Sequence, residues 1–387
     1  MAKLESQWAE VELAVRSLNR QLKHALPPTS LRFDSLARIQ PRPGFLKGRK
    51  IERVIFFLKS NGCEWARDPE GAGGCSMCGH IAGTSRGDIP PTELVTQFAH
   101  AFTNHDFLRF PMLCVYNSGS FLNPREVPDE SRREILSMIA KNDDIEHVII
   151  ESRPEYFNAD VLRELSEMLK GKTIEIGVGL ETHDETIRRA VLNKGVENQA
   201  LEALKGKVRP FDNIRLLFYV LVKPPFLREG YALRNAVESV EYAFGIGADV
   251  VSLEPVSIQD FTIVDLLARA GLYRTPWIWT VIEVVKRTFR HDRLVRMGGF
   301  EFYPVPKEFV HNCARCNTTL VKAIDRFNSI NTLDVFAGID CTCKTESWAK
   351  ETECSDYPSP SEILAQANSV NLRAIIEQMK ADFIIRK

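Results

Sequence analysis

The sequence predicts an α/β protein built around a partial barrel of six parallel strands with helices on its outer face. Three observations support this fold class. Short apolar runs alternate with amphipathic segments from residue 53 onward, a pattern typical of a parallel sheet covered by helices. Small, charged or conformationally constrained residues follow each run, as they do where barrel strands end at an active site. A basic stretch precedes this region and a cysteine-rich segment follows it, which predicts an extension at each end.

An amphipathic helix is predicted before the barrel. Its apolar stripe recurs at spacings of three and four and consists of Trp8, Val11, Val15, Leu18 and Leu22. Pro27 ends the helix. Its other face carries Arg16, Arg20 and Lys23, and the stretch 29–53 is also basic. These charges would contact phosphate if the partner is a nucleic acid, whereas a solvated linker explains them equally well.

The elements of the barrel follow in order. The runs assigned to strands are Val54–Leu58, Met112–Tyr116, His147–Ile150, Thr173–Val178, Ile214–Val222 and Val250–Leu253. The segments assigned to helices are Pro124–Lys141, Ala159–Leu169, Glu185–Leu192 and Tyr231–Phe244. We therefore divide the chain into an N-terminal helix with a basic extension (1–52), the barrel (53–290) and a C-terminal cysteine-rich, metal-binding segment (291–387).

The composition is that of an ordinary soluble globular protein, with 387 residues, a formal net charge of −1 and 44% hydrophobic residues. The chain contains no run of ~18 apolar residues such as a membrane span needs. Its N-terminus lacks the apolar core of a signal peptide. Nine cysteines in clusters indicate metal thiolates in a reducing compartment rather than disulfides. We therefore expect a cytoplasmic protein without membrane association.

Three cysteines follow the first predicted strand. Cys63, Cys75 and Cys78 form the pattern C-x11-C-x2-C. Three thiolates suit a four-iron cluster that keeps one iron open, because a fourth protein ligand would block that position. The alternative is a structural zinc site in which His80 supplies the fourth ligand. The cysteines alone do not decide between the two.

Charged side chains gather at the predicted strand ends, because Arg153, Glu155, Glu181, Lys223 and Glu254 all follow apolar runs. The carboxyl ends of parallel barrel strands meet at one face, so these side chains should lie together. A purely structural barrel has no reason to place them all there. Their convergence predicts an active site. For Lys223 we weigh contact with a substrate phosphate against a solvated position on the rim.

A second cysteine group lies near the C-terminus, in the pairs C-x2-C and C-x-C formed by Cys313, Cys316, Cys341 and Cys343. Four thiolates are enough for a closed tetrahedral zinc site. An auxiliary iron–sulfur cluster and a metal-free group of reduced thiols are the alternatives. The expected role of the group is to tie the C-terminal segment to the barrel.

Together, the triad and the strand ends resemble the radical S-adenosylmethionine (radical SAM) superfamily, although C-x11-C-x2-C is longer than the usual triad. The stretches IEIGVGLET and AVLNKG resemble its Elongator-catalytic-subunit branch. More narrowly, four stretches in order resemble the radical enzyme subunit of archaeosine synthase: NSGSFLNPREVP, ESRPEYF, GVGLETHDETIRRAVLNKG and VKPPFL. The resemblance extends from about Gly62 to the C-terminal cysteines.

The resemblance implies a 4Fe-4S cluster whose open iron chelates S-adenosyl-L-methionine, held by Cys63, Cys75 and Cys78. It implies that the loop Ser118, Gly119, Ser120 receives the methionine amino group. The alternative is an ordinary strand-to-helix loop. Arg153 would bind the methionine carboxylate, whereas the alternative is an ion pair with Glu151 or Glu155 that shapes the rim.

The adenosine half of the cofactor would contact the next strands. Gly177 and Gly179 would let the backbone approach the adenosine. Glu181 would accept hydrogen bonds from the ribose, and Glu254 would act similarly. No residue is assigned a catalytic acid–base role.

The resemblance also implies a function in archaeosine biosynthesis. The substrate would be a tRNA whose 7-cyano-7-deazaguanine base a partner subunit has joined to lysine. A radical would take hydrogen from the lysine side chain, and carbon–nitrogen scission would leave an amidine, which makes the protein a radical lyase that needs a one-electron reductant. The alternatives are another radical SAM tRNA-modifying enzyme and a non-enzymatic protein that binds zinc and nucleic acid. Anaerobically purified protein would be brown in the first two cases and colourless in the third.

Overall fold

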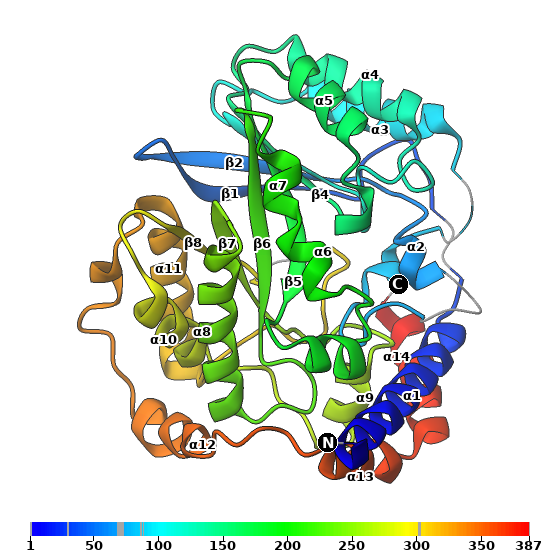
Figure 1. Ribbon diagram of the computed structural model, residues 1–387, viewed down its shortest axis with the longest axis vertical. Helices are drawn as coiled ribbons and strands as arrows, with labels where there is room; N and C mark the ends of the chain where they lie inside the picture. The colour runs from blue at the N-terminus through cyan, green and yellow to red at the C-terminus, as the bar shows by residue number, and fades with distance from the viewer. Residues whose placement is uncertain are drawn as a thin grey trace.

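One eight-stranded sheet forms the centre of the molecule, in a computed structural model that describes residues 2–28, 31–67, 73–85, 87, 89–300 and 303–386. The strands lie in chain order: β1 (Arg38–Leu46), β2 (Arg49–Phe57), β3 (Met112–Tyr116), β4 (His147–Glu151), β5 (Thr173–Glu181), β6 (Ile214–Val222), β7 (Val250–Pro255) and β8 (Leu294–Met297). β2 to β8 run parallel, and β1 pairs antiparallel with β2. The sheet curls into a partial barrel (Figure 1), and the six predicted strands are confirmed as β2 to β7.

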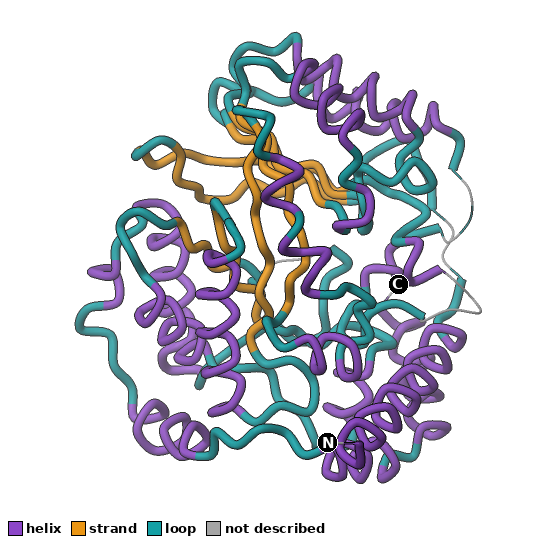
Figure 2. Tube along the Cα trace, in the orientation of Figure 1, coloured by secondary structure: helices purple, strands orange, loops and turns teal. Residues whose placement is uncertain are grey.

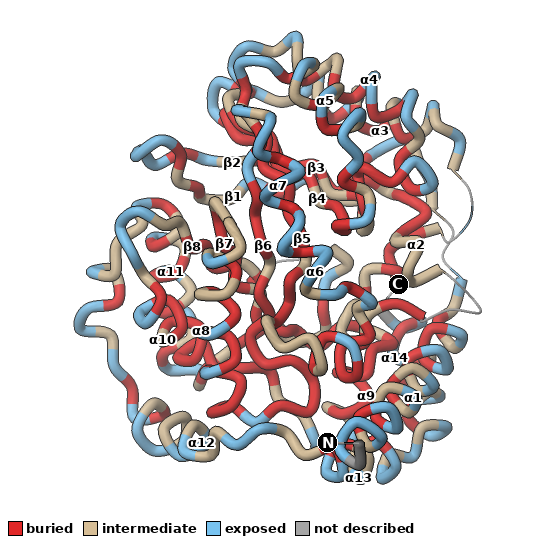
Figure 3. Tube along the Cα trace, viewed as in Figure 1, coloured by how far each residue is buried: buried red, intermediate tan, exposed pale blue. Residues whose placement is uncertain are grey.

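The strands are buried on both faces, which explains their continuous apolar sequences. In β2, Val54 and Phe56 point outward into the core that the helices cover. Ile55 and Phe57 alternate with them and point into the barrel interior. Figure 3 shows the same burial along the central strands.

Two strands were missed by the sequence analysis, and both lie at the edges of the sheet. Pro41 and Pro43 argue against a strand in the basic stretch, but β1 is an edge strand, where proline is tolerated. β8 has only four residues and includes Arg296, so its apolar signal is weak. The predicted boundary between residues 52 and 53 falls inside β2.

Helices connect the strands and cover the sheet (Figure 2). They are α1 (Ala2–Ala25), α2 (Glu64–Arg67), α3 (Pro91–Thr103), α4 (Asp129–Ala140), α5 (Ala159–Met168), α6 (Asn198–Glu202), α7 (Leu204–Val208), α8 (Glu229–Gly245), α9 (Ile263–Arg269), α10 (Ile278–Thr288), α11 (Ala314–Ile330), α12 (Ala349–Glu353), α13 (Pro360–Ser369) and α14 (Leu372–Arg386). The predicted helix 124–141 begins only at Asp129, because Pro128 precedes it. The predicted helix 185–192 is mostly a π-helical turn, Ile187–Val191. Within the described residues, no helix is both long and apolar enough to cross a membrane.

The first helix packs against the end of the chain. The apolar stripe of α1 is buried in a second core that it shares with α9, α13 and α14, and Figure 1 shows α1 beside the C-terminal helices. Trp8 also meets Tyr357 edge to face. The N-terminal helix is therefore held by C-terminal residues beside the barrel.

The open side of the partial barrel is covered by α11. This helix packs against both edge strands, β1 and β8, and against β2. Asp325 of α11 lies 3.7 Å from the Arg42 guanidinium of β1. Because Cys313 caps α11 and Cys316 lies in its first turn, the C-terminal cysteines sit at the start of the helix that closes the barrel.

Candidate functional site

The carboxyl ends of the parallel strands open into a cavity of about 310 Å³. Its lining includes the cysteine triad and every predicted cofactor-binding residue: Cys63, Cys75, Cys78, Ser118, Gly119, Ser120, Arg153, Gly177, Gly179, Glu181 and Glu254. Residues far apart in the sequence therefore converge at one place, as the strand-end pattern predicts. What each of them binds stays a prediction.

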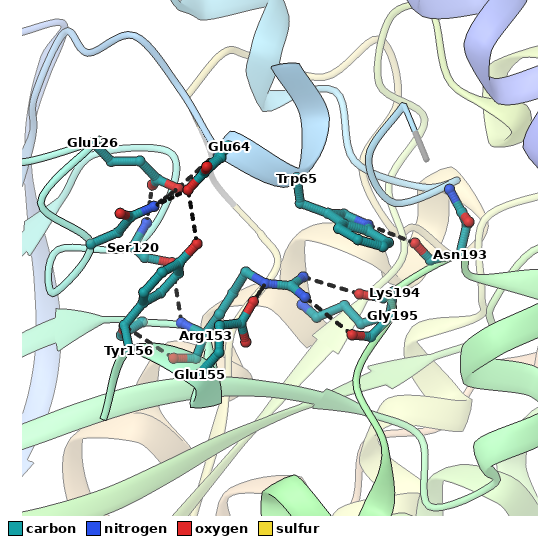
Figure 4. Close-up of polar contacts among 12 residues, drawn as sticks. Glu64, Trp65, Ser120, Glu126, Arg153, Glu155, Tyr156, Asn193, Lys194 and Gly195 are labelled. Carbon is teal, nitrogen blue, oxygen red and sulfur yellow. Dashed lines mark hydrogen bonds and ion pairs between the residues drawn. The ribbon is translucent and has the colours of Figure 1, made fainter. Parts of the chain in front are cut away.

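The described part of the cysteine loop is held by side chains from α1 and from the turn after the π-helix. Asn19 of α1 donates to the carbonyl oxygens of Gly73 and Gly74, at 2.8 and 2.6 Å. Asn193 donates to the same Gly74 carbonyl at 2.7 Å. The Trp65 indole donates to the Asn193 carbonyl oxygen at 2.8 Å (Figure 4). These contacts fix the loop over the cavity.

The three thiols suit a site that brings its own positive charge. Burial raises the pKa of Cys63 to about 12 and that of Cys75 to about 11. A metal ion or cluster would be needed to hold them as thiolates. Among the described residues, the triad and His80 do not form a group whose ligand atoms all lie within 4.8 Å of one another. Because a tetrahedral zinc ion needs sulfur atoms about 3.8 Å apart, this arrangement fits a larger cluster better than a single ion.

Glu126 joins the loop after β3 to the cysteine loop, a role that the sequence analysis missed. Its buried carboxylate accepts hydrogen bonds from the backbone N–H groups of Glu64, at 2.8 Å, and of Ser120. A Cβ atom at Gly119 would lie 1.9 Å from Glu126 Oε2, so only glycine fits there. Ser118 adopts a left-handed conformation with φ of 57°. Such strain is common where a loop is held for function.

Arg153 is held by three neighbours (Figure 4). Its Nε donates to Glu155 at 2.5 Å, and its terminal nitrogens donate to the carbonyl oxygens of Lys194 and Gly195 at 3.0 and 3.2 Å. The guanidinium also lies over the Trp65 ring, 4.9 Å from its centre. The ion pair with Glu155 that we weighed as an alternative is therefore present. Three of the five N–H groups are used, and two remain for a ligand.

The two glycines of β5 make room for protein side chains. A Cβ at Gly177 would meet the Tyr219 ring at 2.7 Å, and one at Gly179 would meet the Lys194 ammonium at 2.3 Å. Lys194 in turn pairs with Glu181 at 2.6 Å. Burial alone would lower the pKa of Lys194, but the charges of Glu181 and of the Cys75 thiolate raise it above its usual value.

Lys194 was missed although it lies in the stretch AVLNKG. The sequence offers one signal for it: Lys194 is the only charged residue in this stretch, whose other residues, apart from Asn193, are apolar or small. Only the fold shows that this lysine meets Glu181, the last residue of β5.

Both expectations for Lys223 are wrong. Its side chain is buried and forms an ion pair with Glu229 of α8 at 2.8 Å. It lies 5.5 Å from the centre of the Tyr273 ring and does not line the cavity. Lys223 therefore fastens α8 to the end of β6, in a left-handed conformation with φ of 61°.

The basic stretch reaches the cavity through Arg42 and Arg53, but its turn between β1 and β2 lies elsewhere. Lys47 and Arg49, at the β1–β2 turn, pair with Glu146, which directly precedes β4. This turn therefore lies at the amino ends of the parallel strands, opposite the cavity. Lys23 of α1 is buried and donates to the Cys78 carbonyl oxygen, so it supports the cysteine loop and is not exposed to a phosphate.

The four C-terminal cysteines converge as predicted. Their ligand atoms all lie within 4.8 Å of one another. The sulfur atoms are 3.6 Å apart for Cys313 and Cys316, 3.5 Å for Cys313 and Cys341, and 3.6 Å for Cys316 and Cys343. These distances are close to the edge of about 3.8 Å expected for four sulfurs around one tetrahedral zinc ion. The group is a candidate metal site of a different kind from the triad.

Comparison with known proteins matches no family model. Archaeosine synthase subunit beta from Methanosarcina acetivorans is 29% identical over 325 residues, which cover 82% of this chain and 90% of that protein. The protein of the same name from Thermococcus kodakarensis is 28% identical over 77% of this chain and 91% of its own length. Among solved structures, methylornithine synthase gives a TM-score of 0.43 with 14% identity, over 76% of this chain and 74% of that one. An Elp3 protein from Methanocaldococcus infernus gives 0.41 with 13% identity, over 62% and 59%. Along most of its length, the chain is thus similar in sequence to archaeosine synthase subunit beta, as its motifs predicted.

Proposed function

We propose that this chain is the radical SAM subunit of an archaeosine-forming enzyme that acts on tRNA. The observation that carries the proposal is the similarity to two proteins named archaeosine synthase subunit beta over more than three quarters of the chain. It is supported by the convergence of Cys63, Cys75 and Cys78 with the strand-end residues around one cavity.

Different residues around the cavity would hold the cluster and S-adenosylmethionine. The triad would hold a 4Fe-4S cluster, and the two free N–H groups of Arg153 would meet the methionine carboxylate. When bound, the cluster and S-adenosylmethionine supply a carbon-centred radical that takes a hydrogen atom from the substrate. The loop 118–120 would orient the methionine end, and the partial barrel, with α11 over its open side, would exclude water from the reacting atoms.

The substrate in this proposal is a tRNA base that carries lysine through an amidine nitrogen. Loss of a side-chain hydrogen atom followed by carbon–nitrogen scission would release an unsaturated amino acid and leave a nitrogen-centred radical on the base. One electron from the reductant and one proton would convert that radical to the amidine, and the scission is the chemistry of a lyase. The relatives are named as subunits, so a partner that attaches the lysine is part of the proposal. The proposal also includes a one-electron reductant for the cluster and a cytoplasmic location for the protein.

The C-terminal cysteines would hold one zinc ion. Sulfur spacings of 3.5–3.6 Å suit four thiolates on a single ion. In an iron–sulfur cubane each thiolate binds a different iron, which spreads the sulfurs further apart. The zinc site would fix the start of α11 against the barrel.

The proposed function is tested with anaerobically reconstituted protein, S-adenosylmethionine, reductant, the partner subunit and lysine-modified tRNA. We expect 5′-deoxyadenosine together with archaeosine in the digested tRNA. The triple alanine variant of Cys63, Cys75 and Cys78 should lose both products and its iron absorbance, but keep the C-terminal metal. Deoxyadenosine without loss of the lysine adduct would show that the substrate is another one, and iron retained by the triple variant would refute the cluster assignment.

A further inference from the structure

Three charged side chains of the cavity lack an ion-pair partner within the described part of the chain. Most charged groups in its lining are paired: Arg42 with Asp325, Arg153 with Glu155, Lys194 with Glu181, and Arg296 with Glu175. Arg53, Glu151 and Glu254 also line the cavity, but no ion pair within 4.0 Å joins any of them to a described residue. Burying a charge without a partner is costly. These three groups are therefore available to a ligand.

The three groups lie close enough to influence one another. Glu254 interacts electrostatically with both Glu151 and Arg53, and all three line the same cavity. Its carboxylate accepts one hydrogen bond, from the Ser252 hydroxyl at 2.7 Å. The Nε atom of Arg53 is buried without a hydrogen-bond partner among the described residues. The Tyr219 hydroxyl also lines the cavity and interacts with the Glu151 carboxyl and with Tyr116, although it makes no hydrogen bond of normal geometry to a described residue.

This pattern of charge fits a ligand with two positive groups and one negative group, of which the negative group and one positive group are adjacent. A lysine joined to a base through its side-chain nitrogen has these charges: an amidinium, then a chain of methylenes, then an ammonium and a carboxylate on one carbon. The cavity wall between the charged groups is apolar and includes Ile55, Phe57, Leu217, Leu221 and Met297. Such a wall suits the methylenes.

We propose that Glu151, Glu254 and Arg53 form the binding site for the lysine arm of the substrate, with the amidinium on Glu151, the ammonium on Glu254 and the carboxylate on Arg53. This assignment rests on the function proposed above and specifies which residues recognise its substrate. It gives Glu254 a substrate role in place of the ribose contact that the resemblance implies. Tyr219 is positioned to add a hydrogen bond to the same ligand.

S-adenosylmethionine carries a similar set of charges, but the position of Arg53 argues against it as the occupant. Arg53 lies four residues before the end of β2, and the cysteine loop follows that end. At about 3.3 Å per residue, its backbone is about 13 Å along the strand from the level of the loop. A cofactor chelated at the triad would leave this depth of the cavity to the substrate.

The test uses the full chain, reconstituted anaerobically, and a probe that carries the arm without RNA or base: Nε-acetimidoyl-L-lysine. Two analogues each lack one group. N-acetimidoyl-cadaverine lacks the carboxylate, and 6-acetimidamidohexanoate lacks the α-ammonium. Binding is measured by calorimetry for the wild type, for Glu254→Gln and for Arg53→Met. Matched controls are Glu241→Gln on the outside of α8 and Arg49→Met on β2, both of which pair with residues away from the cavity.

We expect Glu254→Gln to weaken binding of the probe and of N-acetimidoyl-cadaverine roughly ten- to a hundredfold, and to leave binding of 6-acetimidamidohexanoate unchanged. Arg53→Met should weaken binding of 6-acetimidamidohexanoate and leave binding of N-acetimidoyl-cadaverine unchanged. The control variants should match the wild type. Either variant alone decides the question if the other does not fold, as judged by its thermal transition.

Several results would overturn the assignment. They are the absence of saturable probe binding to the wild type, equal losses for both analogues in each variant, or weakened binding of S-adenosylmethionine with unchanged binding of the probe. The failure of the proposed function is separate. A wild type that binds the probe in this charge-dependent way but forms no archaeosine from correctly modified tRNA retains the binding site and refutes the function.

Discussion

Asn328 of α11 forms two hydrogen bonds with Met297 of β8: its Oδ1 accepts from the Met297 N–H at 2.9 Å, and its Nδ2 donates to the Met297 carbonyl oxygen at 2.8 Å. The side-chain amide thus takes the place of a neighbouring strand at the exposed edge of the partial barrel. Cys313 and Cys316 lie at the other end of the same helix. The C-terminal metal site and the closure of the barrel are therefore physically connected.

Replacing Cys316 by serine should weaken this closure. Loss of one thiolate removes much of the metal's contribution to folding, so we expect Tm to fall by roughly 5 °C or more. Hydrogen exchange should quicken in α11, β1 and β8 more than in the central strands β4 and β5. The control is Cys354→Ser, because Cys354 lies outside the four-cysteine group. Equal Tm values and exchange rates for the two variants would contradict the prediction.

Gly119→Ala should destabilise the loop that carries the predicted cofactor contacts. The new methyl group would overlap Glu126 Oε2, which lies 1.9 Å from the position of a Cβ atom. Relief of that overlap would break the bonds from Glu126 to Ser120 and Glu64. We expect the free energy of unfolding to fall by roughly 2–4 kcal/mol, and less iron to be incorporated on reconstitution.

Gly206→Ala is the matched control for this substitution. A Cβ at Gly206 of α7 would meet nothing within 4 Å. Because alanine favours a helix over glycine, that variant should be unchanged or more stable by up to ~1 kcal/mol. Chemical denaturation of both variants makes the comparison. A Gly119→Ala protein as stable as Gly206→Ala would mean that Glu126 can move aside freely.

Arg153→Ala should weaken S-adenosylmethionine binding roughly ten- to a hundredfold, because a charge-assisted pair with the carboxylate is lost. Iron content should be kept, since no sulfur ligand is removed. Glu155→Gln removes the partner of Arg153 but leaves the guanidinium in place, and should change the cofactor affinity little. Equilibrium binding to protein of known iron content measures both. If Arg153→Ala binds as tightly as the wild type, Arg153 only shapes the rim.

The stability of the ligand-free protein should fall as pH rises from 5 to 8. Burial raises the pKa of both Glu151 and Glu254 to about 7 from 4.5. Between these values the folded protein holds protons that the unfolded chain has released, so raising the pH favours unfolding. Each carboxyl contributes a loss of roughly 1–3 kcal/mol across this range.

Glu254→Gln should remove part of this dependence, because a glutamine does not titrate. Denaturation at pH 5, 6, 7 and 8 compares the variant with the wild type and with Glu241→Gln, a control at a partly exposed position outside the cavity. Binding of the lysine-arm probe should change in the opposite sense and strengthen as pH rises through 7, since the ammonium needs an ionised carboxylate. Parallel stability curves for the wild type and Glu254→Gln would show that Glu254 is already ionised at pH 5.

Much of the fold could be predicted because each central strand carries its own signal. β2 to β7 are buried on both faces, and an apolar run of their length has few other interpretations. The convergence of the strand ends followed from the same prediction, since parallel strands bring their carboxyl ends to one face. The paired spacing of the C-terminal cysteines likewise predicted one compact site, and their sulfurs do meet.

The sequence by itself thus determined the central strands, the face where the site lies and the grouping of the cysteines. Only the tertiary structure decided how the charges are paired. Lys223 pairs with Glu229, and Arg153 pairs with Glu155 but keeps two N–H groups for a ligand. Arg53, Glu151 and Glu254 form no ion pair with a described residue. The edge strands β1 and β8, and the position of α11 over the open side of the barrel, likewise emerge only from the tertiary structure. The physical reason is that an apolar run reports its own burial, whereas the partner of a charge depends on how a curved sheet brings distant elements within a few ångströms of one another.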